Sequence, residues 1–248
     1  MTTPKPASPP QPAAAAATTI PGATRASRKR DSAVNRIARQ FAGPSGPIGH
    51  LVTWQLARGN ASFNRWLVHE LATVVRPPET VIELGCGPGI ALRELLSAYP
   101  AARVVGADPS ATVLKSARRR NARAIEVGRL VLTTGDVATV ADHAPADLVL
   151  ACHVLYFWAD PVGELRRVGQ LLAPDCHVAL GYQLRQHMPP VAGRAFPQGG
   201  FAVYDSDDQV AAVLRQAGFA SPEIRVFGDP SHPGGRLALA TPTPGTLG

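Results

Sequence analysis

The decisive stretch is Thr80-Val81-Ile82-Glu83-Leu84-Gly85-Cys86-Gly87-Pro88-Gly89-Ile90-Ala91-Leu92. Residues 80–84 are mostly apolar or β-branched, three glycines follow at every second position, and an apolar-periodic segment comes next. This pattern predicts a buried strand, a tight loop and a helix. Glycine has no Cβ, so such a loop can turn with positive φ and lie against a ligand at the positive end of the helix. We therefore expect a ligand at residues 85–89.

The details of this loop separate it from two phosphate-binding loops. The dinucleotide fingerprint Gly-x-Gly-x-x-Gly needs a third glycine, but Ile90 and Leu92 stand where it would fall. The Gly-Lys-Ser/Thr of a P-loop does not follow either. Glu83 would repel an anion at the end of the strand, whereas it suits a ligand that carries an amine or a cationic centre. The loop therefore disfavours a phosphate-rich nucleotide.

The pattern Glu83-x-Gly85-x-Gly87-x-Gly89 resembles the first motif of class I S-adenosylmethionine (SAM)-dependent methyltransferases. The resemblance covers residues 50–240 and is strongest at residues 83–89, Asp108, Asp136 and residues 147–155. It implies SAM as the cofactor and SN2 transfer of a methyl group to an oxygen, nitrogen or carbon of a small-molecule acceptor. Nothing in the sequence demands a metal ion.

Strand and helix patterns alternate from Val81 through five strands, and two further strands at residues 223–227 and 236–240 form a hairpin. The predicted fold is α/β, a three-layer Rossmann-like sheet of seven strands with helices on both faces. The order 3-2-1-4-5-7-6 is what the resemblance implies. We expect residues 173–175 to end a helix before the fifth strand, and residues 228–235 to link the last two strands.

Asp108 ends the second predicted strand, 19 residues after Gly89. Doubly wound folds place an acid that binds a ribose diol about 20 residues after the glycine motif. A carboxylate accepts hydrogen bonds from both hydroxyls, so we favour ribose binding. The alternative is an N-cap for a helix over residues 110–121.

Other cofactor contacts are expected at the ends of the third and fourth strands. The resemblance implies that Asp136 accepts from the adenine amino group and that the backbone of Val137 donates to the ring. Ala151 and Cys152 close the fourth strand, where open α/β sheets bind ligands. The predicted cofactor-binding residues are Glu83, Gly85, Cys86, Gly87, Gly89, Asp108, Pro109, Asp136, Val137, Ala151 and Cys152.

His153 and Tyr182 are the candidate general bases, needed if the acceptor atom is a carbon or a hydroxyl oxygen. A single histidine at a strand end is more often a packing or hydrogen-bonding residue. The aromatic residues 156–158 either line the acceptor pocket or fill the core. Residues 58–60 and Asn64 either reach the cofactor carboxylate or form a helix cap and turn. Residues 183–205 are polar and rich in proline and glycine, which predicts a lid or insert.

With 248 residues, 45% of them hydrophobic, the chain can bury one sizeable core. The predicted organisation is an arm over residues 1–31, an N-terminal helical cap over residues 32–76 and a SAM-binding core over residues 77–241. No apolar run reaches the roughly 18 residues that a membrane span needs. The three cysteines show no metal-ligand spacing, so we expect reduced thiols and a cytoplasmic location.

The net charge of +7 lies almost entirely near the N-terminus. Residues 1–40 hold seven basic residues and one acid, and the remaining 18 basic and 17 acidic residues nearly cancel. The arm is rich in proline and alanine, which predicts disorder, with a transit peptide as the alternative. A nucleic-acid methyltransferase that docks through this arm, or a SAM-binding regulator without catalysis, are the rival functions. The near-neutral core disfavours a nucleic-acid partner.

Overall fold

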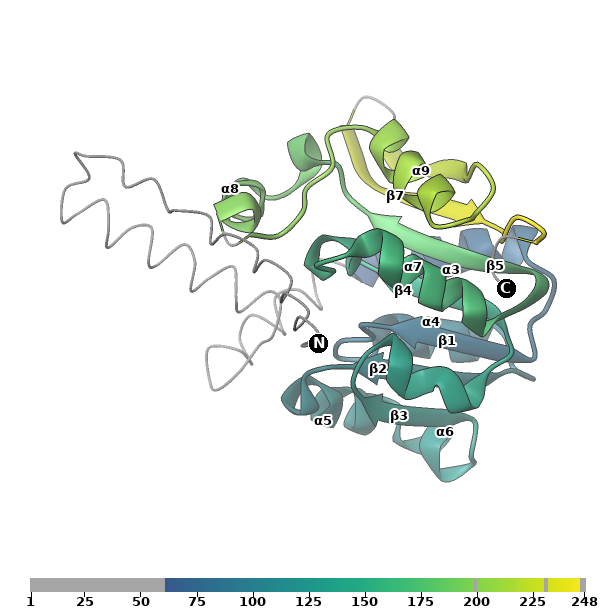
Figure 1. Ribbon diagram of the computed structural model, residues 1–248. Helices are drawn as coiled ribbons and strands as arrows, with labels where there is room; N and C mark the ends of the chain where they lie inside the picture. Colours follow the sequence, from purple (N-terminus) through teal and green to yellow (C-terminus); the bar gives the residue numbers. More distant parts are fainter. Residues whose placement is uncertain (1–60, 199, 230–231, 246–248) are drawn as a thin grey trace, which may run out of the picture.

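The computed structural model describes residues 61–198, 200–229 and 232–245, and the strands in these ranges form one seven-stranded sheet. The strands are β1 (Thr80–Leu84), β2 (Arg103–Asp108), β3 (Leu130–Thr134), β4 (Ala146–Cys152), β5 (Leu172–Tyr182), β6 (Glu223–Asp229) and β7 (His232–Ala240). Their order is β3-β2-β1-β4-β5-β7-β6, with β7 antiparallel to β5 and β6 and the other neighbours parallel. The predicted α/β fold and strand order are confirmed (Figure 1).

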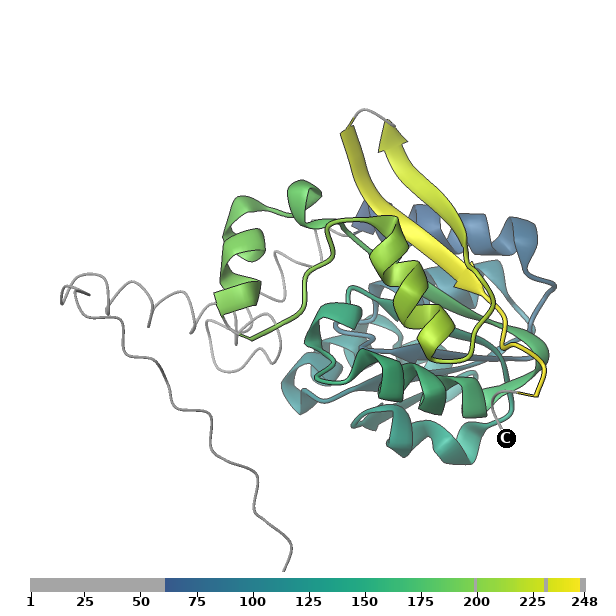
Figure 2. The same ribbon diagram turned by 45° about the horizontal axis from the view of Figure 1, so that its top comes forward.

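Helices cover both faces of this sheet (Figures 1 and 2). The described helices are α3 (Ala61–Val74), α4 (Ile90–Ala98), α5 (Ala111–Arg120), α6 (Ala122–Glu126), α7 (Pro161–Leu171), α8 (Pro190–Gln198) and α9 (Asp207–Gln216). Short 3-10 turns are η1 (Val137–His143), η2 (Leu155–Phe157) and η3 (Arg185–His187). The core on one face includes side chains of α3, α4 and α5, and that on the other includes side chains of η1, α7 and α9.

Alternating side chains in the central strands join the two core layers. Val81 pairs in register with Val104 and Leu148, and all three face the layer of α3 and α4. Their neighbours in sequence, such as Ile82 and Val149, face the layer of α7 instead. Burial on both sides explains the continuous apolar runs, since each such side chain contributes about 1.5–3 kcal/mol when fully buried.

The strand order places the switch point of the sheet between β1 and β4. From β1 the chain winds outward through β2 to β3, then returns to form β4 on the other side of β1. The loops after β1 and β4 therefore leave in opposite directions and open a crevice at the carboxyl ends of these strands, where open α/β sheets bind their ligands.

Two predicted boundaries were wrong, and the predicted insert has secondary structure of its own. Residues 173–175 do not end the preceding helix, because α7 ends at Leu171 and Leu172 already pairs with Ala146 as the start of β5. The predicted insert is not a plain loop, since it contains η3 and α8. The final hairpin is longer than expected, with pairing that extends to Asp229 and His232.

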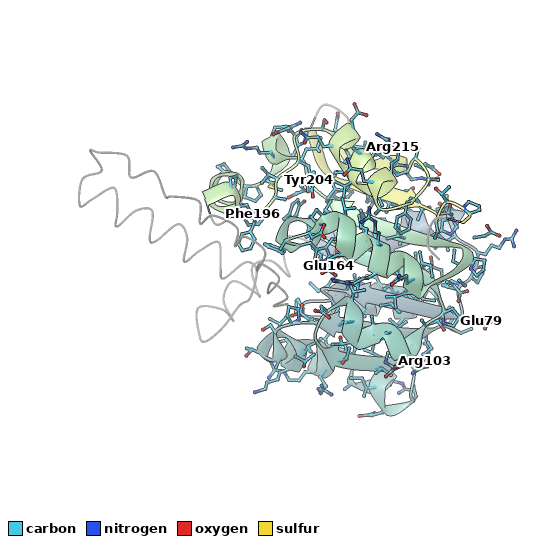
Figure 3. The ribbon with its side chains drawn as sticks, in the orientation of Figure 1. Glu79, Arg103, Glu164, Phe196, Tyr204 and Arg215 are labelled. Atoms are coloured by element: carbon cyan, nitrogen blue, oxygen red, sulfur yellow. The ribbon has the colours of Figure 1, made fainter. Side chains whose placement is uncertain are left out.

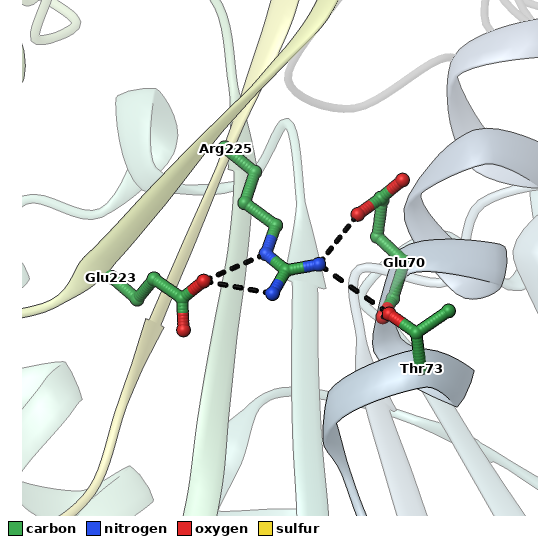
Figure 4. A network of polar contacts seen from close by, with 4 residues as sticks. All are labelled: Glu70, Thr73, Glu223 and Arg225. Carbon is green, nitrogen blue, oxygen red and sulfur yellow. Dashed lines mark hydrogen bonds and ion pairs between the residues drawn. The ribbon is translucent and has the colours of Figure 1, made fainter.

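The predicted arm, residues 1–31, and residues 32–60 of the predicted cap lie outside the described residues. The described part of that cap is α3, which packs on α4 and reaches the hairpin. Arg225 on β6 donates to Glu70 of α3 at 2.7 Å and pairs with Glu223, so it bridges the helix and the sheet edge (Figure 4). None of the described helices has the length and apolar character to cross a membrane.

We expect Gly89→Ala to destabilise the fold by about 1–3 kcal/mol more than Gly128→Ala. Both glycines have positive φ, 76° and 73°, so alanine is strained at either position. A Cβ on Gly89 would lie 2.6 Å from Asn121 Nδ2 and 3.0 Å from Ala117 Cβ, whereas the space around Gly128 is open. Urea unfolding measures both variants, and equal losses of stability would contradict this packing role for Gly89.

Candidate active site

A cavity of about 410 Å³ opens at the carboxyl ends of β1 to β4. It lies within the size range of small-molecule sites. Ten of the thirteen predicted site residues line it: Glu83, Gly85, Cys86, Gly87, Asp108, Pro109, Asp136, Val137, Cys152 and His153. The parallel strands end at the same edge of the sheet, so residues far apart in the chain meet around one space.

The glycine loop after β1 forms one wall of the cavity. Gly85 and Gly87 adopt φ of 65° and 53°, the left-handed region that glycine allows. A Cβ on Gly85 would collide with Val154 at 2.4 Å, so the tight contact with the loop after β4 requires glycine there. A Cβ on Gly87 would meet nothing closer than a backbone oxygen at 3.9 Å. Gly87 also lines the cavity, so its missing side chain leaves room for a ligand.

Asp108 holds this loop and the start of α5 in place. Its Oδ2 accepts from the Gly87 N–H at 3.0 Å, and its Oδ1 accepts from the Ser110 N–H at 2.8 Å. The cap of α5 is Ser110, so Asp108 is not the helix cap that the alternative required. Burial raises the pKa of Asp108, and the two backbone donors oppose this shift.

Glu83 is the most deeply buried acid that lines the cavity, with 2% of its surface exposed. Its Oε2 has no hydrogen-bond partner within the described part of the chain. Burial raises the pKa of Glu83 well above its ordinary value, and the charge of Asp108 raises it further. A buried carboxylate oxygen without a donor calls for a donor or cation from a ligand.

Asp136 lies at the end of β3 with its side chain exposed and caps η1 by accepting from the Ala138 N–H at 3.0 Å. Val137 is buried directly behind it. Their contacts with an adenine ring remain predictions. Asp147, in the segment that resembles the family, instead accepts from the N–H groups of Glu79 and Thr80 at the opposite end of β1.

His153 follows β4 and lies between the two ends of the cavity. It has a positive φ of 57°, unusual for a side-chain-bearing residue, and its backbone N–H donates to Gly181 at 2.7 Å. Burial lowers the pKa of His153 to about 4, so the imidazole is neutral at pH 7. Its Nε2 is buried and has no partner among the described groups.

Three predicted site residues lie outside the cavity lining. Ala151 is buried within β4, and Gly89 packs against α5 through the Asn121 side chain, which donates to the Gly89 carbonyl at 3.1 Å. Tyr182 is fully buried, and its hydroxyl donates to Asp207 at 2.7 Å. This bond directs the Tyr182 hydroxyl toward α9, and of the two candidate bases only His153 lines the cavity.

The sequence predicted the far wall of the cavity only in part: residues 156–158 line the cavity, as one of the two alternatives for them required, but the residues of the segment after β5 were not identified. Met188, Pro189, Ala192 and Phe196 lie in the segment after β5 and line this wall with Tyr156, Phe157 and Trp158. Figure 3 shows Phe196 at the α8 end of the molecule, far from Glu79 at the start of β1. The signal was the apolar pattern of residues 188–196 inside a segment with loop composition. Within the described ranges, no three His, Cys, Asp or Glu side chains gather as a metal site.

Part of this chain resembles proteins that are named as methyltransferases. The family model described as "Methyltransferase domain" matches residues 82–178, which run from within β1 through the glycine loop and β2 to β4 into β5. This part of the chain is a methyltransferase domain. A trans-aconitate 2-methyltransferase of Methylobacterium radiotolerans is 37% identical over 97 residues, or 39% of this chain and 35% of that protein. A malonyl-[acyl-carrier protein] O-methyltransferase of Legionella pneumophila is 30% identical over 139 residues, covering 54% and 46%.

Solved structures share the fold of this methyltransferase domain. A putative O-methyltransferase of Nostoc punctiforme superposes with a TM-score of 0.63 at 17% identity, over 86% of this chain and 68% of that one. The plantazolicin methyltransferase BpumL, in complex with SAH, gives 0.62 at 13% identity over 86% and 97%. The chain spans less than half the length of the curated relatives it matches, so the names of those relatives do not fix its own activity or acceptor.

We expect Glu83→Gln to stabilise the ligand-free methyltransferase domain by on the order of 1 kcal/mol at pH 8. The pKa of Glu83 is raised in the folded state, so unfolding releases its proton above the ordinary carboxyl pKa. Wild-type stability therefore falls as the pH rises through that window, and each pKa unit is worth about 1.4 kcal/mol. Glutamine does not titrate, so the variant should keep its stability as the pH rises through this window.

The measurement is urea unfolding between pH 4 and 8, with the exposed Glu126→Gln as the control. The control should follow the wild-type profile. A Glu83→Gln profile parallel to that of the wild type would contradict the buried-carboxylate assignment.

Proposed function

We propose that this chain is a SAM-dependent methyltransferase that methylates an oxygen, nitrogen or carbon of a small-molecule acceptor by SN2 transfer. The observation that best supports this proposal is that one cavity has a polar, acidic end and an aromatic end. One end has the glycine loop and the acids Glu83 and Asp108; the other has the aromatic rings of residues 156–158. Cys152 and His153 lie where the two ends meet.

The residues of the first end fit the parts of SAM. We assign Asp108, at the end of β2, to the ribose hydroxyls and Asp136, at the end of β3, to the adenine amino group. The buried Oε2 of Glu83 suits the cationic part of the molecule, because it has no donor of its own in the described structure. Gly87 allows close approach of the backbone.

When bound, SAM supplies a methyl group that is already electrophilic on its sulfonium, and the S–CH₃ bonding pair stays on sulfur as the acceptor forms its bond to carbon. The contribution of the chain is to hold the acceptor in line and to exclude water. Neutral His153 can accept a hydrogen bond from a hydroxyl or amine of the acceptor, and the proton leaves through this contact or to water.

The described lining disfavours an organic tricarboxylate as the acceptor. Trans-aconitate appears in the names of several relatives, but no Lys or Arg of the described residues lines the cavity. The basic arm on which a nucleic-acid acceptor would depend lies outside the described residues. A small molecule is the proposed acceptor, and residues 77–241 are the proposed catalytic core.

We expect Asp108→Ala to weaken SAM binding by on the order of 1 to 3 kcal/mol, since two ribose hydroxyls lose their acceptor. Isothermal titration with SAM measures the loss. Asp108→Asn should fall between wild type and alanine because it keeps one acceptor oxygen. Asp142→Ala, an exposed acid on η1, is the control and should bind like the wild type. Unchanged affinity in Asp108→Ala would remove the ribose assignment.

Turnover is tested with SAM labelled on its methyl group and a pool of small metabolites. Transfer of label to a pool component that requires His153 or the cavity-lining residues would support the enzyme. SAM binding without transfer to any component would favour the non-catalytic regulator.

A further inference from the structure

The far wall of the cavity indicates which class of acceptor fits. We infer that the acceptor is an uncharged, planar aromatic compound with one hydroxyl or amine at the position that is methylated. This inference rests on the proposed function, since it concerns the second end of the same cavity. Three features support it: the aromatic wall, the sign of the lining charges and the placement of the unpartnered polar atoms.

Aromatic rings from two separate segments build the wall. Tyr156 and Phe157 of η2 meet Phe196 of α8 with ring centroids 5.7 and 5.2 Å apart, the latter pair edge to face. Trp158 follows η2 and lines the same space. Rings at these separations pack favourably, and a flat ring of a ligand can extend the same arrangement by stacking or by edge contact. A flat aromatic body therefore complements this wall.

The charges of the lining have a single sign. Glu83, Asp108 and Asp136 are the acids that line the cavity, and no Lys or Arg among the described residues does so. A carboxylate or phosphate on the acceptor would lose its hydration without meeting a cation among the described side chains, and it would be repelled by these acids. An uncharged acceptor avoids both costs.

Most polar groups near the wall already have partners. The Tyr156 hydroxyl accepts from the Gln183 N–H and donates to the Gln183 carbonyl, and the Gln183 side chain donates to Gly234. The Cys152 thiol donates to the Asn64 side chain at 3.2 Å. Because these groups already have hydrogen-bond partners, few of them remain to bind a polar acceptor.

Two buried side-chain atoms of the described lining lack partners: Glu83 Oε2 and His153 Nε2. The first belongs to the cofactor end. The second lies beside the aromatic wall, because the His153 ring stacks near Tyr156 with centroids 6.3 Å apart. A single hydroxyl or amine on an otherwise apolar acceptor would satisfy it and would lie next to the cofactor end.

The test compares matched ligands on the full chain by isothermal titration, with and without SAH. Three sets are built on phenol, 1-naphthol and 2-naphthol, each with a ring-carboxylated and a ring-saturated analogue. At least one neutral aromatic member should bind tenfold or more tighter than both of its analogues. A carboxylated member that binds best, a saturated member that binds equally well, or no binding by any neutral aromatic member would overturn the inference.

Substitutions in the aromatic wall test where the aromatic ligand binds. Phe157→Leu and Phe196→Leu should each weaken the best aromatic ligand at least fivefold, while SAH affinity stays within twofold of the wild type. Phe219→Leu is the matched control, because this buried ring lies outside the cavity lining. Equal affinity for that ligand in all three variants would overturn the aromatic wall as the binding surface.

His153→Ala tests the polar contact. Wild type should bind 2-naphthol at least fivefold tighter than naphthalene, and the variant should bind both equally. A preference that persists in His153→Ala would remove His153 as the partner of the acceptor. The SAH titration reports separately on the proposed function: absence of SAH binding contradicts that function, whereas SAH binding with a preference for carboxylates contradicts the acceptor class alone.

Discussion

The site depends on burying two carboxylates next to each other at the ends of β1 and β2. Glu83 pairs in register with Gly106, two residues before Asp108, so the parallel register brings the acids to one edge. Burial raises the pKa of both, and the charge of Asp108 adds to the shift of Glu83. The folded sheet therefore holds an electrostatic cost that a donor or cation from a ligand would offset.

The same pair of strand ends also fixes the glycine loop. The Cys86 N–H donates to the Ala107 carbonyl at 2.9 Å, which carries the β1–β2 hydrogen bonding one step into the loop. Asp108 then accepts from Gly87, and Gly89 is held against α5 by Asn121. The loop is supported along its length by groups of the chain itself. Such support keeps the backbone N–H groups in place before any ligand arrives.

The sequence predicted the features that depend on local pattern. Hydrophobic runs and the glycine spacing located the strands, and the distance from Gly89 located Asp108. Spacing gives a place along the chain but no direction for a side chain or a backbone group, which explains why Tyr182 and Gly89 were predicted at the site although they lie outside the cavity lining. The early start of β5 depends on pairing with β4, and α8 depends on its contacts with η2. Neither has a strong signal within its own segment.

The two ends of the cavity differ in how their residues are brought together. The proposed cofactor end comes from residues 83–137 at the ends of neighbouring strands, so its form follows from the sheet itself. The acceptor end brings Phe196 onto Tyr156, 40 residues apart in sequence, through a segment that begins after β5. The family match ends at residue 178, before this segment. The match therefore includes the glycine loop, the two acids and residues 156–158, but not α8, which can change without disturbing the sheet edge that holds the two acids.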